Sequence, residues 1–270
     1  RLELRADGSY STDPTASFTG TGTHFKTGTG ELMVYNLRPV GNVEVRGGIL
    51  NLKGTSNLGN GAPYNSTLSI SSGAILDHGN AETIRLNGEI AGTGILRRSA
   101  MGNGNTLITG NKKSFSGTVI ATGAGFLGGT SDVSNGFSIV ESGGSIGGLW
   151  AEDRSGGTFI VSNLSFKTTN SRLRVTARSP DDNTPSLLEV RARTTSAPGR
   201  VVANNGFTVD VPSPKINNGY ILKCENGVSS RLPLPVTGVN NTGKTLYFRW
   251  DGIGLYMITQ GLICDNCTFQ

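Results

Sequence analysis

Apolar and polar residues alternate along this chain in short runs, and Gly, Asn, Ser or Asp bounds nearly every run. Such runs predict short β-strands separated by turns. The clearest runs lie at 43–45, 68–70, 84–86, 118–120, 173–175, 188–192 and 207–211. No window has the i, i+3, i+4, i+7 apolar spacing of an amphipathic helix. We therefore expect an all-β protein.

Glycine precedes an apolar pair at recurring intervals, in segments that start at 47, 72, 92, 123 and 143. A loose period of this size predicts stacked repeats, because each unit is too small to bury its own apolar face. We expect a right-handed parallel β-helix, that is, a β-solenoid. A β-sandwich is the alternative, because Asn-Gly and Asp-Gly pairs, which favour tight hairpins, recur along the chain.

The spacing of the short apolar runs changes in the last 70 residues, where it is interrupted by Pro212, Pro214, Pro233 and Pro235. Residues 1–200 are expected to form the solenoid body, including an N-terminal strand. Residues 201–270 are expected to form terminal coils or a more irregular β cap. Solenoid ends need such caps because open strand edges pair with other chains.

The composition agrees with a coiled β-structure. The chain has 40 glycines in 270 residues, and only 16% of its residues are charged. Glycine and asparagine supply the positive φ angles that corners need. A helical bundle is excluded by the shortage of helix-forming runs, and no apolar stretch is long enough for a membrane-spanning helix.

The net charge of +5 is spread thinly, and its densest positive region is 167–215. Arg172 and Arg174 are spaced by two, which places them on one side of a strand. Together with Trp150 they are the candidate contacts for surface glycans. No aromatic residues interleave with the arginines, so the region does not predict a nucleic-acid surface.

The three cysteines are Cys224, Cys264 and Cys267, and the last two form a C-x-x-C motif. Zinc would need four ligands, and the two histidines lie far away in the sequence. We expect one disulfide, Cys224 with either Cys264 or Cys267, which leaves one thiol free or paired with another chain.

Catalytic signals are weak. The candidate carboxylates are Asp77, Glu141, Glu152, Asp153, Asp181 and Asp182, and most of them lie in loop-like segments. Asp77 and His78 are neighbours on a strand, so they face opposite sides, and His78 is expected at the surface. No phosphate-binding loop, calcium loop or Ser-His-Asp set can be assembled. We expect no enzymatic activity, no cofactor and no metal.

Residues 113–123, with Phe115, Gly117 and Val119, followed by Phe126-Leu127, resemble the autotransporter-associated β-strand repeat. The run 45–52 resembles the strand that opens such a unit. The resemblance covers about 40–215. It implies a right-handed parallel β-helix in an exported bacterial protein with an adhesive or structural role.

These observations favour an extracellular or cell-surface structural or adhesive protein that associates with itself, as a homopolymer or filament. The N-terminal segment 2–11, with Leu2 and Leu4, is the candidate strand donor to a neighbouring sheet. The alternatives are a polysaccharide-binding or polysaccharide-degrading β-helix, or a segment of a phage tail fibre. We expect export, with the signal absent from this chain.

Overall fold

The structure is a computed structural model of the whole chain. It describes residues 1–99, 104–112, 114–122, 126–129, 138–141, 145–148, 158–161, 163–167, 171–177, 184–191, 200–203, 206–211, 216–224, 236–240 and 246–259. These residues form strands, bridges and turns, and no helix occurs among them. The all-β prediction is confirmed.

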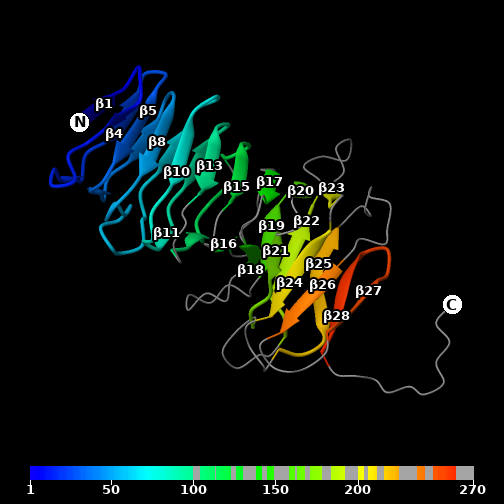
Figure 1. Cartoon of the computed structure of the whole chain (residues 1–270). Coiled ribbons are helices and arrows are strands. Elements are labelled where there is room, and N and C mark those ends of the chain that lie inside the picture. Colours follow the sequence, from blue (N-terminus) through cyan, green and yellow to red (C-terminus); the bar gives the residue numbers. More distant parts are fainter. Residues whose placement is uncertain are drawn as a thin grey trace, which may run out of the picture.

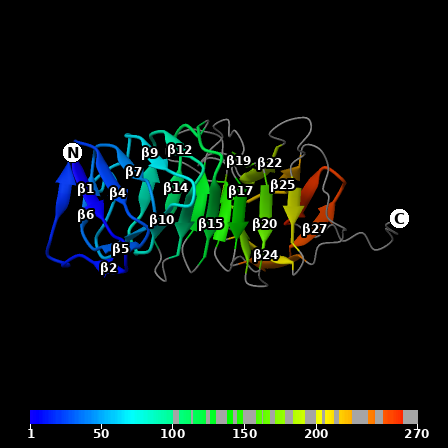
Figure 2. The ribbon, with the colours of Figure 1, turned by 90° about the horizontal axis from the view of Figure 1, so that it is seen from above.

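The strands stack in register into long sheets that run along one rod (Figures 1 and 2). The longest, here called the long sheet, has nine strands: β2 (Tyr10–Ser11), β5 (Glu31–Val34), β8 (Ile49–Leu52), β10 (Ile75–His78), β13 (Ile95–Arg98), β15 (Thr118–Ala121), β17 (Ser138–Glu141), β20 (Asn163–Phe166) and β23 (Arg200–Val202).

A second face of the rod is formed by two five-stranded sheets. The first sheet contains β1 (Leu2–Arg5), β4 (His24–Thr27), β7 (Val43–Val45), β9 (Leu68–Ile70) and β12 (Ile90–Gly92). The terminal sheet contains β19 (Thr158–Val161), β22 (Leu187–Val190), β25 (Gly219–Cys224), β28 (Gly254–Ile258) and β27 (Tyr247–Trp250). In both sheets a strand such as β4 or β19 is followed along the chain by a strand of the long sheet, so both lie at the same stage of the coil.

The third face contains β3 (Phe18–Gly20) and β6 (Leu37–Pro39), and then a seven-stranded sheet. That sheet is built from β11 (Ile84–Leu86), β14 (Thr106–Ile108), β16 (Phe126–Gly129), β18 (Ser145–Gly148), β21 (Arg172–Arg174), β24 (Phe207–Val211) and β26 (Val236–Asn240).

Up to β26, each strand pairs in parallel with the strand one coil away, as β5 does with β8 and β8 with β10. Successive strands of the long sheet begin about 20 residues apart along most of its length. This is a β-solenoid, and the sandwich alternative is wrong, because a sandwich of hairpins would pair its neighbours antiparallel.

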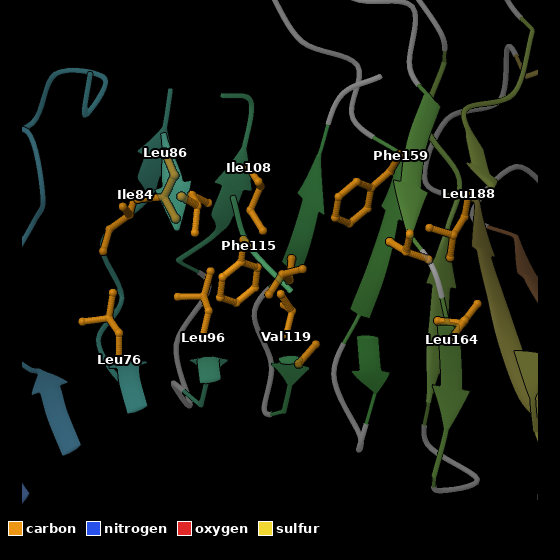
Figure 3. Close-up of a cluster of buried hydrophobic side chains, with 14 of the residues drawn as sticks. Leu76, Ile84, Leu86, Leu96, Ile108, Phe115, Val119, Phe159, Leu164 and Leu188 are labelled. Atoms are coloured by element: carbon orange, nitrogen blue, oxygen red, sulfur yellow. The ribbon is translucent and has the colours of Figure 1, made fainter. Parts of the chain in front are cut away.

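The core is a column of apolar side chains inside the coil (Figure 3). In the long sheet, Leu50, Leu76, Leu96 and Val119 occupy one register column and are all buried. Alternate residues of the same strands face outward, as the period of two requires. Each coil therefore buries its apolar side chains against the coils above and below.

A column of small residues fixes the corner that leads into the long sheet. Gly30, Gly48, Ala74, Gly94 and Gly117 each stand directly before one of its strands. A Cβ on Gly30 would lie 1.9 Å from the carbonyl oxygen of Gly8, and a Cβ on Gly117 would lie 2.0 Å from that of Gly94. The coils approach so closely here that three backbone amides, those of Ile49, Ile75 and Thr118, bond to the carbonyls of Gly30, Gly48 and Gly94. The predicted glycine corners at 47–50 and 92–96 are confirmed.

The parallel pattern ends at a hairpin. β27 pairs antiparallel with β28, and β28 pairs antiparallel with β25. Asp251-Gly252 lies in the connecting turn, where Gly252 has a φ of +89°, as the turn chemistry of an Asp-Gly hairpin requires. The hairpin therefore adds two strands to the end of the terminal sheet.

The glycine column leads to a matched pair of substitutions. Gly30→Ala forces a methyl group against the Gly8 carbonyl, so we expect it to lower the free energy of unfolding by about 3 kcal/mol or more. Gly8 occupies the same column in the first coil, where a Cβ would meet only the Tyr10 ring at 3.4 Å. Gly8→Ala should therefore change stability by less than about 0.5 kcal/mol.

Urea-induced unfolding of both variants at equal monomer concentration is the measurement. If both variants lost the same free energy of unfolding, close contact between coils could not be the reason why glycine is required at position 30.

Candidate functional site

The N-terminal end of the rod carries unpaired strand edges. β1, β2 and β3 are each the first strand of a sheet among the described strands. The amides of Leu2 and Ala6 donate to the carbonyls of Thr23 and Thr27 in the second coil. Because N–H groups of successive strand residues point to opposite sides, Glu3 and Arg5 direct their amides to the open side. The predicted donor strand 2–11 thus forms the first coil, and its outer edge is available for pairing.

This end also exposes apolar side chains that face inward elsewhere. Tyr10 aligns with Leu32 in the long sheet, yet Tyr10 is 56% exposed. Leu2 and Leu4 align with His24 and Lys26 of the next coil, both buried, whereas Leu2 and Leu4 are only half-buried. Phe18 is also half-buried. A capped solenoid end has a polar outer face, so this end has the character of an interface.

Inside the rod, a buried polar group surrounds His78. His78 is 1% exposed and its Nδ1 lies 2.7 Å from Thr106 Oγ1, one coil further on. Its Nε2 lies 3.1 Å from Asn80 Oδ1. Asn80 Nδ2 donates to the carbonyl of Ser56, so Asn80 Oδ1 must accept from His78 Nε2. When the imidazole is neutral, its Nδ1 accepts from the Thr106 hydroxyl.

The expectation that His78 lies at the surface is wrong. His78 aligns with Leu52 and Arg98 on the inward side of the long sheet, while Asp77 faces outward. Arg98 is fully buried, and its guanidinium donates to the carbonyls of His78 and Gly104. Burial, followed by the nearby Arg98 charge, lowers the pKa of His78 to about 4. These side chains hold backbone carbonyls at the corner that follows the strand.

One signal for this cluster is present in the sequence. Arg97 and Arg98 directly follow the apolar pair Ile95-Leu96, so if the strand continues through them one of the two must face inward. Leu96 is the inward residue by pattern, and Arg98 shares its side. An inward arginine requires hydrogen-bond acceptors within the coil. Arg98 finds them in the carbonyl oxygens of His78 and Gly104.

The outer face of the long sheet carries a polar ladder. Asn51, Asp77 and Arg97 align on three successive strands. Arg97 donates to Asp77 Oδ2 at 2.6 Å, and Asn51 Nδ2 donates to Glu31 Oε1 at 2.8 Å. Asp77 is 2% exposed. A buried carboxylate paired with an arginine fits a structural role better than proton transfer to a substrate.

The other predicted site residues are dispersed. Arg172 and Arg174 flank the buried Leu173 and face outward together, as their spacing predicts. The Arg174 guanidinium lies 3.7 Å from an Asp210 carboxylate oxygen. Trp150, Glu152, Asp153, Asp181 and Asp182 lie outside the described residues, so a glycan contact here stays a prediction.

Cys224 is buried in β25. Cys264 and Cys267 lie outside the described residues, and their disulfide with Cys224 stays a prediction. Within the described ranges no group of His, Cys, Asp and Glu side chains could hold a metal ion. Among the same residues no helix has the length and apolar character needed to cross a bilayer.

Comparison with known proteins adds no relative. No family model matches the chain, and no curated protein or solved structure shows a significant match to it.

The depressed pKa of His78 predicts a stability loss in acid. In the unfolded chain His78 binds a proton below pH 6.5, whereas in the folded chain it binds one only near pH 4. Stability therefore falls as the pH drops from about 6.5 to 4, by about 3 kcal/mol from this group. The free energy of unfolding should be measured by urea titration across this range.

His78→Gln is the matched control, since glutamine cannot titrate but can bond to Asn80 or Thr106. We expect the variant to lose most of the slope between pH 6.5 and 5, where few carboxylates titrate. An unchanged slope in His78→Gln would contradict the buried neutral imidazole.

Proposed function

We propose that this protein is an extracellular or cell-surface structural element, adhesive or scaffolding in role, that associates with itself through the ends of its solenoid. The observation that carries the proposal is the N-terminal end of the rod, where three unpaired strand edges and four apolar side chains that are not buried lie together. An exposed edge of this kind is a template for another strand.

The body of the rod supports a mechanical role. Its sheets are continuous, with nine strands in the long sheet, so pulling along the rod is resisted by backbone ladders at every coil. Buried polar side chains reinforce these ladders. The Lys26 ammonium, for example, donates to the carbonyls of Thr27, Gly28 and Gly47 and so ties the second coil to the third.

The resemblance to autotransporter-associated repeats and the low charge agree with an exported surface protein. Arg172 and Arg174 face outward and could also contact surface glycans. A module that only binds a ligand would not need the open strand edges and apolar side chains at the N-terminal end. The proposal therefore rests on self-association first.

The test is sedimentation of the purified chain over a wide concentration range, with and without reductant. We expect species larger than one chain, whose share rises with concentration and persists in reductant, because edge pairing needs no disulfide. A chain that stays monomeric throughout the range would contradict the proposal.

A further inference from the structure

We propose that copies of this chain join head to tail, with β27 of one copy pairing in parallel with β1 of the next. The inference rests on the proposed self-association and names the two strands that perform it. The occupant of the N-terminal edge is then a second copy of the chain, added at its C-terminal hairpin.

The two strands are the outermost strands of equivalent sheets. β1 is at one end of the first sheet and β27 is at one end of the terminal sheet, so each has a free edge among the described strands. Both sheets lie at the same stage of the coil, directly before the long sheet. Figure 2 shows β1 and β27 near opposite ends of the rod. Joining them would continue one face of the solenoid from copy to copy.

The direction of β27 permits this pairing. β28 runs antiparallel to β25, and β27 runs antiparallel to β28. The two reversals cancel, so β27 runs in the same direction as β25 and the other parallel strands of that face. A β1 strand placed on the outer edge of β27 would therefore pair in parallel, as β1 already does with β4.

The apolar side chains on the two edges match in spacing. Phe248 and Trp250 are half-buried and pack on the core, while Tyr247 is exposed. Leu2 and Leu4 are likewise half-buried inward residues two positions apart. Pairing the strands with Leu2 opposite Phe248 and Leu4 opposite Trp250 would place both pairs in the interior, where each covers the surface that the other leaves open.

The same register brings opposite charges together on the outer side. Glu3 would stand beside Arg249, and Arg5 beside Asp251; Glu3, Arg5 and Arg249 are exposed residues of their strands, and Asp251 is exposed in the turn after β27. A shift by one residue would turn Leu2 and Leu4 against outward positions of β27. Charge and apolar pattern thus select one register, and they favour an unlike pair of ends over two like ends.

Such a contact joins different surfaces and does not close on itself, so it produces an open filament. The first coil is suited to accept the next copy, because Gly8 continues the small-residue column to the very end. The Tyr10 ring is the side chain nearest to Gly8 at that corner, and it is exposed.

The test compares Glu3→Pro with Glu3→Ala. Both remove the carboxylate and its bond from Thr27 Oγ1, but only proline removes the amide on the open edge. Neither change touches the Leu2 and Ala6 bonds to the second coil. We expect Glu3→Pro to weaken association at least about tenfold by sedimentation, and Glu3→Ala to weaken it by about fivefold at most.

Glu3→Pro also discriminates between head-to-tail and head-to-head joining. The variant keeps β27, so a small fraction mixed with the unaltered chain should attach to growing ends and shorten the assemblies. In head-to-head pairing of β1 with β1 it would leave the unaltered chain's assemblies unchanged, and that result would overturn the inference.

Charge reversal tests the register. Glu3→Arg or Arg249→Glu alone should weaken association by about fivefold, and the double variant should restore it. If the unaltered chain associates and the Glu3→Pro variant associates just as strongly, the inference fails while the proposed function stands. If the unaltered chain stays monomeric, the proposed function fails and this inference fails with it. Thermal unfolding of each variant confirms that its fold is intact.

Discussion

The structure depends on the hydrogen-bond ladder between one coil and the next, and above all on the corner where two coils come closest. At that corner the residue before β5, β8, β10, β13 and β15 is Gly30, Gly48, Ala74, Gly94 and Gly117 respectively, and the carbonyls of three of these glycines accept a bond from the following coil. A side chain larger than the methyl group of Ala74 would separate the coils and break the ladder on both adjoining faces. The excess of glycine therefore reflects contact between coils as well as turn geometry.

Close stacking also explains the charged side chains inside the rod. Corners leave backbone carbonyls without strand partners, and buried carbonyls need donors. Lys26 and Arg98 supply several donors each, and the His78–Asn80 pair links three segments that are far apart in the sequence. Their burial is costly for an isolated charge but is offset by these bonds. The polar core groups thus hold the corners of successive coils together.

The sequence predicted the class of fold because alternation and glycine spacing are local signals. The short runs at 43–45 and 68–70 became strands, and the glycines before Ile49 and Ile95 became corners. The inward position of His78 was missed, since it depends on partners such as Thr106 and Ser56 that lie in other coils. The open edge of β1 could be suspected from the alternation of residues 2–6. The direction of β27 could not, because it is set by two pairings with β28 and β25 that no local pattern encodes.

A rod whose two ends carry matching edges gives one physical basis for both folding and assembly: each coil, from the same chain or from the next copy, completes the surface left open by the one before. Electron cryomicroscopy of the assembled protein tests this most directly. We expect filaments in which strands spaced about 4.8 Å apart continue across every junction between copies, with β27 of one copy parallel to β1 of the next. Discrete particles one chain long, or filaments in which these two strands run antiparallel at the junction, would contradict it.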